Sequence, residues 1–153
     1  MRTIKLKNKT ASYKLETDDS TVYRINDGTT DQSFNCIDRE GVLPDVQSFA
    51  VLNYIYVAVG QEAAFEKRFL GRSRRLSENK GFLAIRVLRP EQSRHYIIIT
   101  WWEEEADFHA WQASTSYQKT HQKRATDKGL DHQNQVVDRT KSYHLGFQSK
   151  GGM

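Results

Sequence analysis

The chain has 153 residues, of which 37% are hydrophobic and 11% aromatic, a composition typical of one folded domain with a sizeable core. Lys and Arg number 23 against 19 Asp and Glu, and this small excess gives no support to a dedicated nucleic-acid or membrane-surface role. Cys36 is the only cysteine, which excludes an internal disulfide and predicts a reducing, cytoplasmic location.

The first part of the chain, residues 2–45, consists of short alternating segments such as "TIKLKNK" and "TVYRI". Turn-forming clusters separate them ("DDS", "NDGTTD" and "DREG"), so we expect β-hairpins here. The start lacks the apolar segment of a secretory signal. Residues 48–59 are richer in apolar and β-branched side chains and predict a strand that Gly60 ends. This apolar run is too short to span a bilayer.

The next segment, "QEAAFEKRFLGRSRRLSENKG", predicts a helix that places Phe65, Phe69 and Leu76 on one stripe. Gly71 weakens this helix without ending it, and Gly81 is the expected stop. Two strands follow, "FLAIRVLRP" at 82–90 and "HYIIITWW" at 95–102, joined by a short turn.

The acidic start of "EEEADFHAWQ" suits the N-terminus of a second helix. The Ser/Thr run at 114–116 predicts a break, followed by another short helix to about Arg124. The stretch "TDKGLDHQNQ" is expected to be loop, residues 140–147 a final strand, and the tail "QSKGGM" frayed.

The predicted order from Ser48 onward is β-α-β-β-α-β, the ferredoxin-like arrangement of an α+β fold. Both helices should pack on one face of an antiparallel sheet. The other face then needs a second sheet, from another subunit or from the N-terminal hairpins. The expected organisation is a β-rich extension at 1–47 followed by the main domain at 48–148.

Asn53 interrupts an apolar row in the strand at 48–59. Alternation puts it on the same side as Val51, Ile55 and Val57. A buried amide without a hydrogen bond costs about 1–3 kcal/mol, so Asn53 should either find a partner or face a cavity. An ordinary structural role, such as pairing with neighbouring backbone or fixing the strand register, is an equal alternative.

Trp111 and His121 are ten positions apart, around the predicted break. On one continuous helix they would lie about 80° apart around the axis. The break removes this constraint and lets both side chains converge on one pocket. Taken singly, each has an ordinary explanation, because a Trp at helical spacing usually packs in a core and a His among polar residues is usually solvated.

Several stretches in this order resemble the heme-degrading monooxygenases of the antibiotic-biosynthesis-monooxygenase family. They are "FAVLNYIYV", "GFLAIRVLRP" and "YIIITWWEEEADFHAWQASTSYQKTHQKR". The resemblance runs over about residues 48–147, and the functional positions of that group fall on Asn53, Trp111 and His121.

The resemblance implies that heme is both cofactor and substrate. It makes His121 the proximal ligand of the heme iron, Trp111 the side chain that bends the porphyrin, and Asn53 a hydrogen-bond donor that orients dioxygen. Ring opening would then release iron and would need an external reductant, either a reductase or a small molecule. Cations on the two helical regions could meet the heme propionates or could equally form a solvated face: Arg68, Arg72, Arg75, Lys119, Lys123 and Arg124.

The resemblance leaves the assembly open. Short members of the family form homodimers by packing sheet on sheet, whereas longer members resemble this chain in having a β-rich extension and are monomers. Two other functions also stay open: a heme-binding or sensing module that does not turn heme over, and a cofactor-free monooxygenase that acts on an aromatic substrate. No aromatic-and-basic motif for nucleic-acid binding is present in the sequence.

Overall fold

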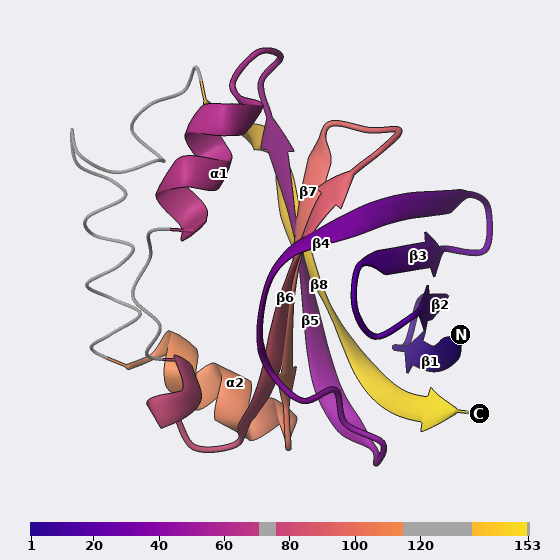
Figure 1. Ribbon diagram of the computed structural model, residues 1–153. Coiled ribbons are helices and arrows are strands. Elements are labelled where there is room, and N and C mark those ends of the chain that lie inside the picture. The colour runs from indigo at the N-terminus through magenta and orange to yellow at the C-terminus, as the bar shows by residue number, and fades with distance from the viewer. Residues whose placement is uncertain (71–75, 115–135, 153) are drawn as a thin grey trace.

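The computed structural model describes residues 1–70, 76–114 and 136–152. Figure 1 shows the chain as a strand-rich body with helices on one side. The elements, in chain order, are β1 (Arg2–Lys7), β2 (Ser12–Thr17), β3 (Val22–Asn26), β4 (Asp31–Gly41), β5 (Ser48–Val57), α1 (Glu62–Leu70), the 3-10 helix η1 (Leu76–Glu78), β6 (Phe82–Pro90), β7 (His95–Trp102), α2 (Glu105–Gln112) and β8 (Val137–Gly152).

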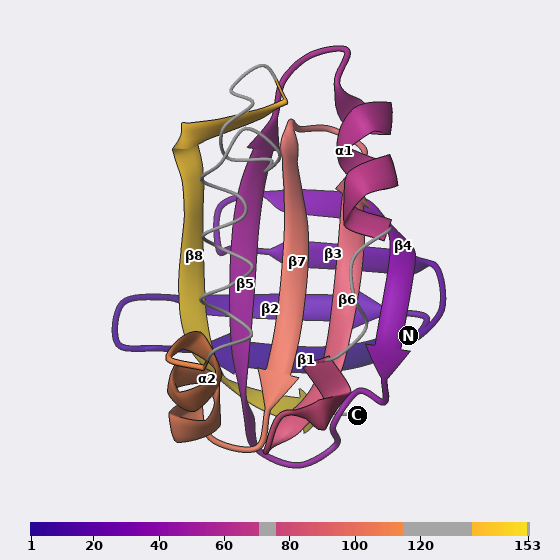
Figure 2. The same ribbon diagram turned by 90° about the vertical axis from the view of Figure 1, so that its left-hand side faces the viewer.

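The strands form a closed barrel in the order β1-β2-β3-β4-β6-β7-β5-β8, and the neighbouring strands pair antiparallel. Figure 2 shows β1–β3 running across the strands β5–β8, while β4 bends and continues alongside β6. The order from Ser48 onward is β5-α1-β6-β7-α2-β8, which confirms the predicted β-α-β-β-α-β arrangement.

The N-terminal hairpins supply the second sheet. Their alternating apolar side chains point into the barrel, where they pack against the inner side of β5–β8. The fully buried members from both parts of the chain include Ile4, Leu6, Leu15, Leu52 and Ile97. The inner face of β5–β8, which the sequence left to a partner subunit or to the extension, is therefore covered within one chain.

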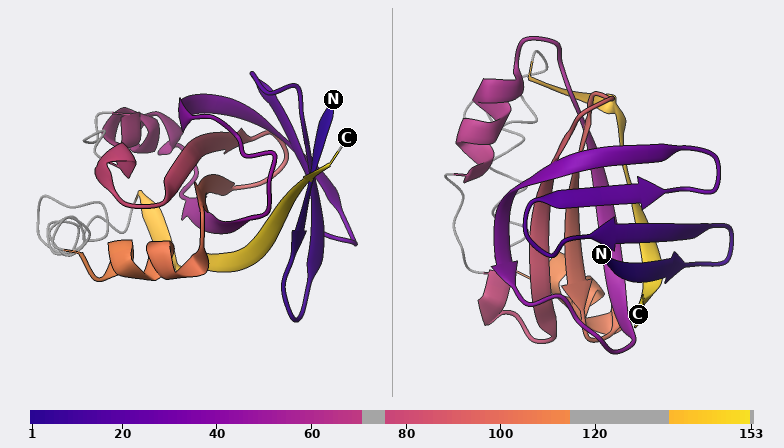
Figure 3. Two further views of the ribbon diagram at one scale, coloured as in Figure 1. Left: turned by 90° about the horizontal axis from the view of Figure 1, so that it is seen from below. Right: turned by 45° about the vertical axis from the view of Figure 1, so that its right-hand side comes forward.

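Three sequence predictions are wrong at their boundaries. The cluster "DREG", expected to be a turn, forms the end of β4. The helix expected to continue to Gly81 ends at Leu70, and Leu76–Glu78 is a separate 3-10 helix. The tail expected to be frayed belongs to β8, and its last residues pair with β1, as in Gly152 with Thr3. Closing the barrel gives this polar tail a partner strand, which local sequence does not show. Figure 3 shows the two chain ends side by side.

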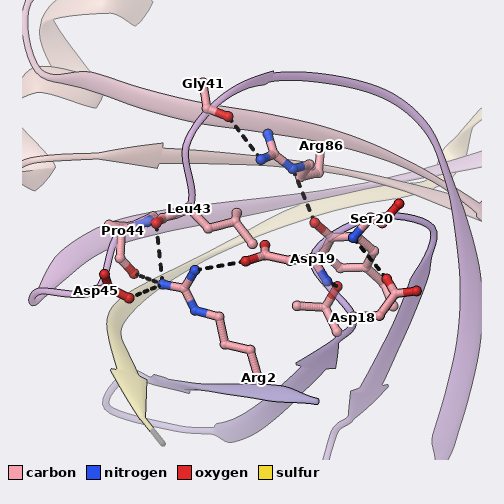
Figure 4. A network of polar contacts seen from close by, with 11 residues as sticks. Arg2, Asp18, Asp19, Ser20, Gly41, Leu43, Pro44, Asp45 and Arg86 are labelled. Carbon is pink, nitrogen blue, oxygen red and sulfur yellow. Dashed lines mark hydrogen bonds and ion pairs between the residues drawn. The ribbon is translucent and has the colours of Figure 1, made fainter.

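A polar network ties the connection between β4 and β5 to the start of the chain (Figure 4). The guanidinium of Arg2 donates to the carbonyl oxygen of Pro44 at 2.7 Å and forms ion pairs with Asp45 at 2.7 Å and Asp19 at 3.3 Å. Arg86 is buried nearby and donates to the hydroxyl of Tyr23 at 3.1 Å. These contacts fix the strand β5 relative to β1, at one end of the barrel.

Both α-helices lie on the outer face of β5–β8, towards opposite ends of the strands (Figures 1 and 2). We call this face the helix face. Phe65 of α1 packs in one apolar cluster on it with Ile55, and Phe108 of α2 packs in a second cluster with Val51. Within the described ranges, no helix is long and apolar enough to cross a membrane.

Candidate functional site

The strand β5 presents Asn53 on the helix face. Its neighbours two positions away, Val51 and Ile55, pack in the clusters beneath α2 and α1 respectively. The alternate residues Leu52 and Tyr54 point into the barrel core. Asn53 thus lies between the two helix-covered clusters, and the predicted alternation of β5 is confirmed.

Asn53 is partly buried and lies opposite Ile98 of β7 and His144 of β8. No group in the part of the chain that the structure describes hydrogen-bonds its carboxamide. A side chain that served only to bind neighbouring backbone would show such a bond. The polar atoms of Asn53 are not completely enclosed, so the amide remains available to a ligand on the helix face, at a smaller cost to stability than a fully buried amide without partners would carry.

Trp111 lies on α2, on the same side of the sheet as Asn53. Its ring centroid is 5.6 Å from that of Trp102 and 6.1 Å from that of Phe108. Trp102 is fully buried, and its indole nitrogen donates to the hydroxyl of Thr100 at 3.1 Å, which fixes the ring on which Trp111 packs. Together with Phe49, these rings form what we call the aromatic platform: Phe49, Trp102, Phe108 and Trp111.

A glycine fixes the N-terminus of α2. Gly81 has a φ of +81°, and a Cβ atom there would lie 2.1 Å from the Asp107 Oδ2 atom. Its carbonyl oxygen accepts a hydrogen bond from the backbone N–H of Glu103 at 2.7 Å, and Asp107 in turn accepts from the N–H of Glu104 at 3.2 Å. Gly81 was predicted to stop a helix, but its observed role is to seat the helix that carries Trp111.

The helix α1 is anchored beside the site by a charged cluster. Arg89 donates two hydrogen bonds to the carboxylate of Glu66, at 2.8 and 2.5 Å, and the hydroxyl of buried Tyr96 donates to the same carboxylate. These bonds, that of Arg89 above all, lower the pKa of Glu66, whereas burial and then the neighbouring carboxylate raise the pKa of Tyr96. Tyr96 lies on the helix face two positions from Ile98, so the cluster holds one edge of this face in place.

The third predicted site residue, His121, lies outside the described residues. The same holds for Arg72, Arg75, Lys119, Lys123 and Arg124. Arg68 is exposed on α1. The structure thus places Asn53 and Trp111 on one face and does not test the part of His121.

Sequence reasoning missed most of the aromatic platform. The signal was present in "HYIIITWW", because alternation from Ile98 places Thr100 and Trp102 on the face of Asn53. Phe49, Trp102 and Phe108 are buried and their rings are tilted against one another, so of the platform only Trp111 is partly exposed, on the same face as the amide of Asn53. In the described part of the chain, no three His, Cys, Asp or Glu side chains gather into a metal site.

Comparisons with known proteins agree with this fold. The sequence profile described as antibiotic biosynthesis monooxygenase matches residues 48–123. A heme oxygenase (mycobilin-producing) of Mycobacterium tuberculosis is 36% identical over 61 residues, which cover 39% of this chain and 58% of the relative. A heme oxygenase (staphylobilin-producing) of Staphylococcus haemolyticus is 33% identical over 79 residues, 50% of this chain and 75% of the relative.

A solved structure shows the same fold over nearly the whole chain. The heme-degrading enzyme of Listeria monocytogenes superposes with a TM-score of 0.60 at 17% identity and covers 95% of this chain and 83% of its own. This likeness includes the N-terminal strands, which the family profile does not reach. On the profile match, and on the relative of which three quarters is covered, the chain belongs to the antibiotic biosynthesis monooxygenase family.

Proposed function

We propose that this protein is a heme-degrading monooxygenase that binds heme on the helix face and opens the porphyrin ring, releasing iron. The observation that carries the proposal is the unpaired carboxamide of Asn53 on the same face as the aromatic platform. The two heme oxygenases with 36% and 33% identity support this choice of substrate.

The chemistry of the described residues fits heme. A porphyrin is a large flat apolar ring, and the partly exposed indole of Trp111, supported by the buried rings beneath it, would contact such a ring. In this proposal His121 is the ligand of the iron, and its neutral imidazole is a common ligand in that role. When bound, heme supplies the redox chemistry with dioxygen and with electrons from a reductase or small reductant.

The described residues each have a separate role in this proposal. Asn53 donates a hydrogen bond from its carboxamide to a polar group held on the helix face. Val51, Ile55 and Ile98 surround that amide with apolar side chains and exclude water. Trp111, resting on Trp102, would contact the bound ring and hold it against the helix face.

The proposed setting is a reducing cytoplasm, consistent with Cys36, whose buried thiol donates to the carbonyl oxygen of Asp38 at 3.2 Å. Because β1–β4 close the barrel within the chain, a monomer is the proposed assembly, with a homodimer as the alternative.

The decisive experiment adds hemin to the purified protein and follows the visible spectrum, first alone and then with ascorbate. We expect a shifted Soret band on binding and loss of that band on reduction in air. His121→Ala should abolish the Soret shift, whereas the matched control His109→Ala should keep it, because the ring of His109 is exposed and contacts Glu105 at 3.0 Å. Trp111→Ala should bind hemin but open the ring slowly.

Each contrary result selects a different function. A Soret shift without bleaching indicates a heme-binding or sensing module. The absence of any Soret shift favours a cofactor-free monooxygenase acting on an aromatic substrate. If His109→Ala loses the shift and His121→Ala keeps it, the assignment of the iron ligand is wrong.

A further inference from the structure

A small cavity lies away from the helix face, between the turn that joins β3 and β4 and side chains of the strands β2, β4, β5, β7 and β8. Its volume is about 90 Å³, the space of about three water molecules, which limits an occupant to a small group of atoms. Aromatic side chains form much of its wall: Tyr13, Phe34, Tyr54, Tyr143 and the imidazole of His95.

The aromatic wall is held in place by its own contacts. Tyr54 is 8% exposed and stacks on Tyr143, with ring centroids 4.7 Å apart and planes inclined by 11°. The ring of His95 meets both at steep angles, with centroids 6.2 and 5.7 Å away. Its Nε2 atom lies 2.9 Å from the carbonyl oxygen of Lys141, so Nε2 carries a hydrogen and donates it to that oxygen.

The hydroxyl of Tyr54 has no hydrogen-bond partner among the described residues, although the side chain is more than nine-tenths buried. It is also absent from the polar atoms that are completely enclosed without a partner, so it opens into the cavity that its ring lines. Such a hydroxyl calls for a partner in the cavity, water or a ligand.

One carboxylate lines the cavity, that of Asp27 in the turn between β3 and β4. Its Oδ1 atom accepts hydrogen bonds from the backbone N–H groups of Thr30 at 2.7 Å and Thr29 at 2.8 Å, which lower the pKa of Asp27. The side chain is therefore ionised at neutral pH. Within the described ranges, no Lys or Arg forms an ion pair with it.

The carboxylate of Asp27 affects the tyrosines that line the cavity. Burial is the main cause that raises the pKa of Tyr13, Tyr54 and Tyr143, and the carboxylate of Asp27 raises each further. The cation of nearby Lys141 is engaged elsewhere, 4.7 Å above the ring of Tyr56. The cavity thus combines aromatic side chains with the carboxylate of Asp27, which is exposed and has no ion pair among the described residues, on a chain whose net charge is +4.

We propose that this cavity binds the head group of a small organic ammonium ion. Ring faces attract cations through their quadrupole, and aromatic cages with a nearby carboxylate suit alkylated ammonium groups. The hydroxyl of Tyr54 and the carboxylate of Asp27 add acceptors for any N–H of the ion. The site is separate from the helix face and does not depend on the proposed heme chemistry.

The test uses choline as the probe and its uncharged analogue 3,3-dimethylbutan-1-ol as the comparison, each titrated into protein with ¹³C-labelled tyrosine rings and followed by NMR. We expect choline to shift the ring signals of Tyr54 and Tyr143 saturably, and to bind at least about tenfold more tightly than the uncharged analogue. An ethanolammonium titration shows whether N–H groups strengthen binding, and a dissociation constant at or below that of choline supports a role for the acceptors.

Two variants make the site specific. Asp27→Asn keeps the side-chain oxygen that caps the turn but removes the charge, and should weaken choline binding about five- to tenfold. Its matched control is Asp31→Asn in the same hairpin, where the carboxylate pairs with Arg24 at 3.2 Å; choline binding should not change. Tyr143→Leu, at a ring that is 48% exposed and can be replaced without disturbing the core, should weaken binding about two- to fivefold.

The proposal is overturned if choline causes no saturable shift, if the uncharged analogue binds equally well, or if Asp31→Asn weakens binding as much as Asp27→Asn. Hemin binding by Asp27→Asn should equal that of the wild type. This keeps failure of the ammonium site distinguishable from failure of the heme function, because either titration can succeed without the other.

Discussion

Replacing Asn53 by Val should make the protein more stable and less active. The carboxamide is partly buried in an apolar row between Val51 and Ile55 and has no hydrogen bond from the described residues. An amide in that environment lowers the free energy of unfolding. Such a residue is typical of a site that binds a ligand. Val has a similar size, and its branched side chain suits a strand.

The size of the gain follows from the burial. A fully buried amide without partners costs about 1–3 kcal/mol by protein mutational data, and a partly buried one about half of that. Asn53→Val should therefore raise the free energy of unfolding by about 0.5–1.5 kcal/mol. For a chain of this size each kcal/mol raises Tm by about 2–4 °C, so the expected rise is about 1–6 °C. Loss of a hydrogen-bond donor that acts in the transition state should slow heme bleaching by about 10²–10³-fold.

The measurement pairs thermal unfolding of the heme-free protein with the bleaching assay. Asn35→Val is the matched control, because Asn35 is also partly buried on a strand but lies on β4, three strands away from β5 in the barrel order. It should leave the bleaching rate unchanged. If Asn53→Val lowers the free energy of unfolding by more than about 1 kcal/mol, or bleaches heme at the wild-type rate, Asn53 is a structural residue and the reasoning fails.

Two further predictions concern the elements that frame the site. Because Arg89 and Tyr96 lower the folded-state pKa of Glu66, its carboxylate stabilises the fold above the unfolded-state pKa of about 4.3, and this contribution disappears as pH falls through the folded value. In urea unfolding, Glu66→Gln should cost about 1 kcal/mol at pH 7 and progressively less as the pH falls below about 4.3; a cost that does not change with pH contradicts the role of the charge. Gly81→Ala places a Cβ atom against Asp107 at a positive φ and should destabilise the fold by about 1–3 kcal/mol, while slowing bleaching through displacement of α2 and Trp111. Wild-type stability and turnover in this variant would show that α2 does not need the close approach of Gly81.

Local patterning determined much of the fold from the sequence alone. The bounds of β6 and β7 agree with the strands expected at 82–90 and 95–102, because apolar β-branched runs between turn residues carry their own signal. The alternation of β5 also placed Asn53 on one side with Val51 and Ile55, since a strand has a fixed period of two residues, and the structure shows that this side is the helix face. The catalytic roles of Asn53 and Trp111, and the iron ligation by His121, remain predictions.

Only the tertiary structure decided how the barrel closes. The tail "QSKGG" has no local strand signal and becomes part of β8 because β1 offers it unpaired backbone groups from the other end of the chain. The strand β4 is 11 residues long and carries an irregularity between Cys36 and Asp38, which lets it pair with β3 at one end and β6 at the other. The composition of residues 1–47 indicated hairpins, but it did not show that β4 is long enough to pair with both β3 and β6.

For each of the two candidate sites, the sequence indicated one part and only the tertiary structure showed the rest. Sequence periodicity could place Asn53 and Trp102 on one face, but the contact of Trp102 with Trp111 depends on Gly81 holding α2 close to the sheet. The small cavity joins Asp27, Tyr54 and Tyr143, which are far apart in the sequence and belong to a turn and two strands. These residues come together because one sheet packs across another. This packing is non-local, and no local sequence pattern encodes it.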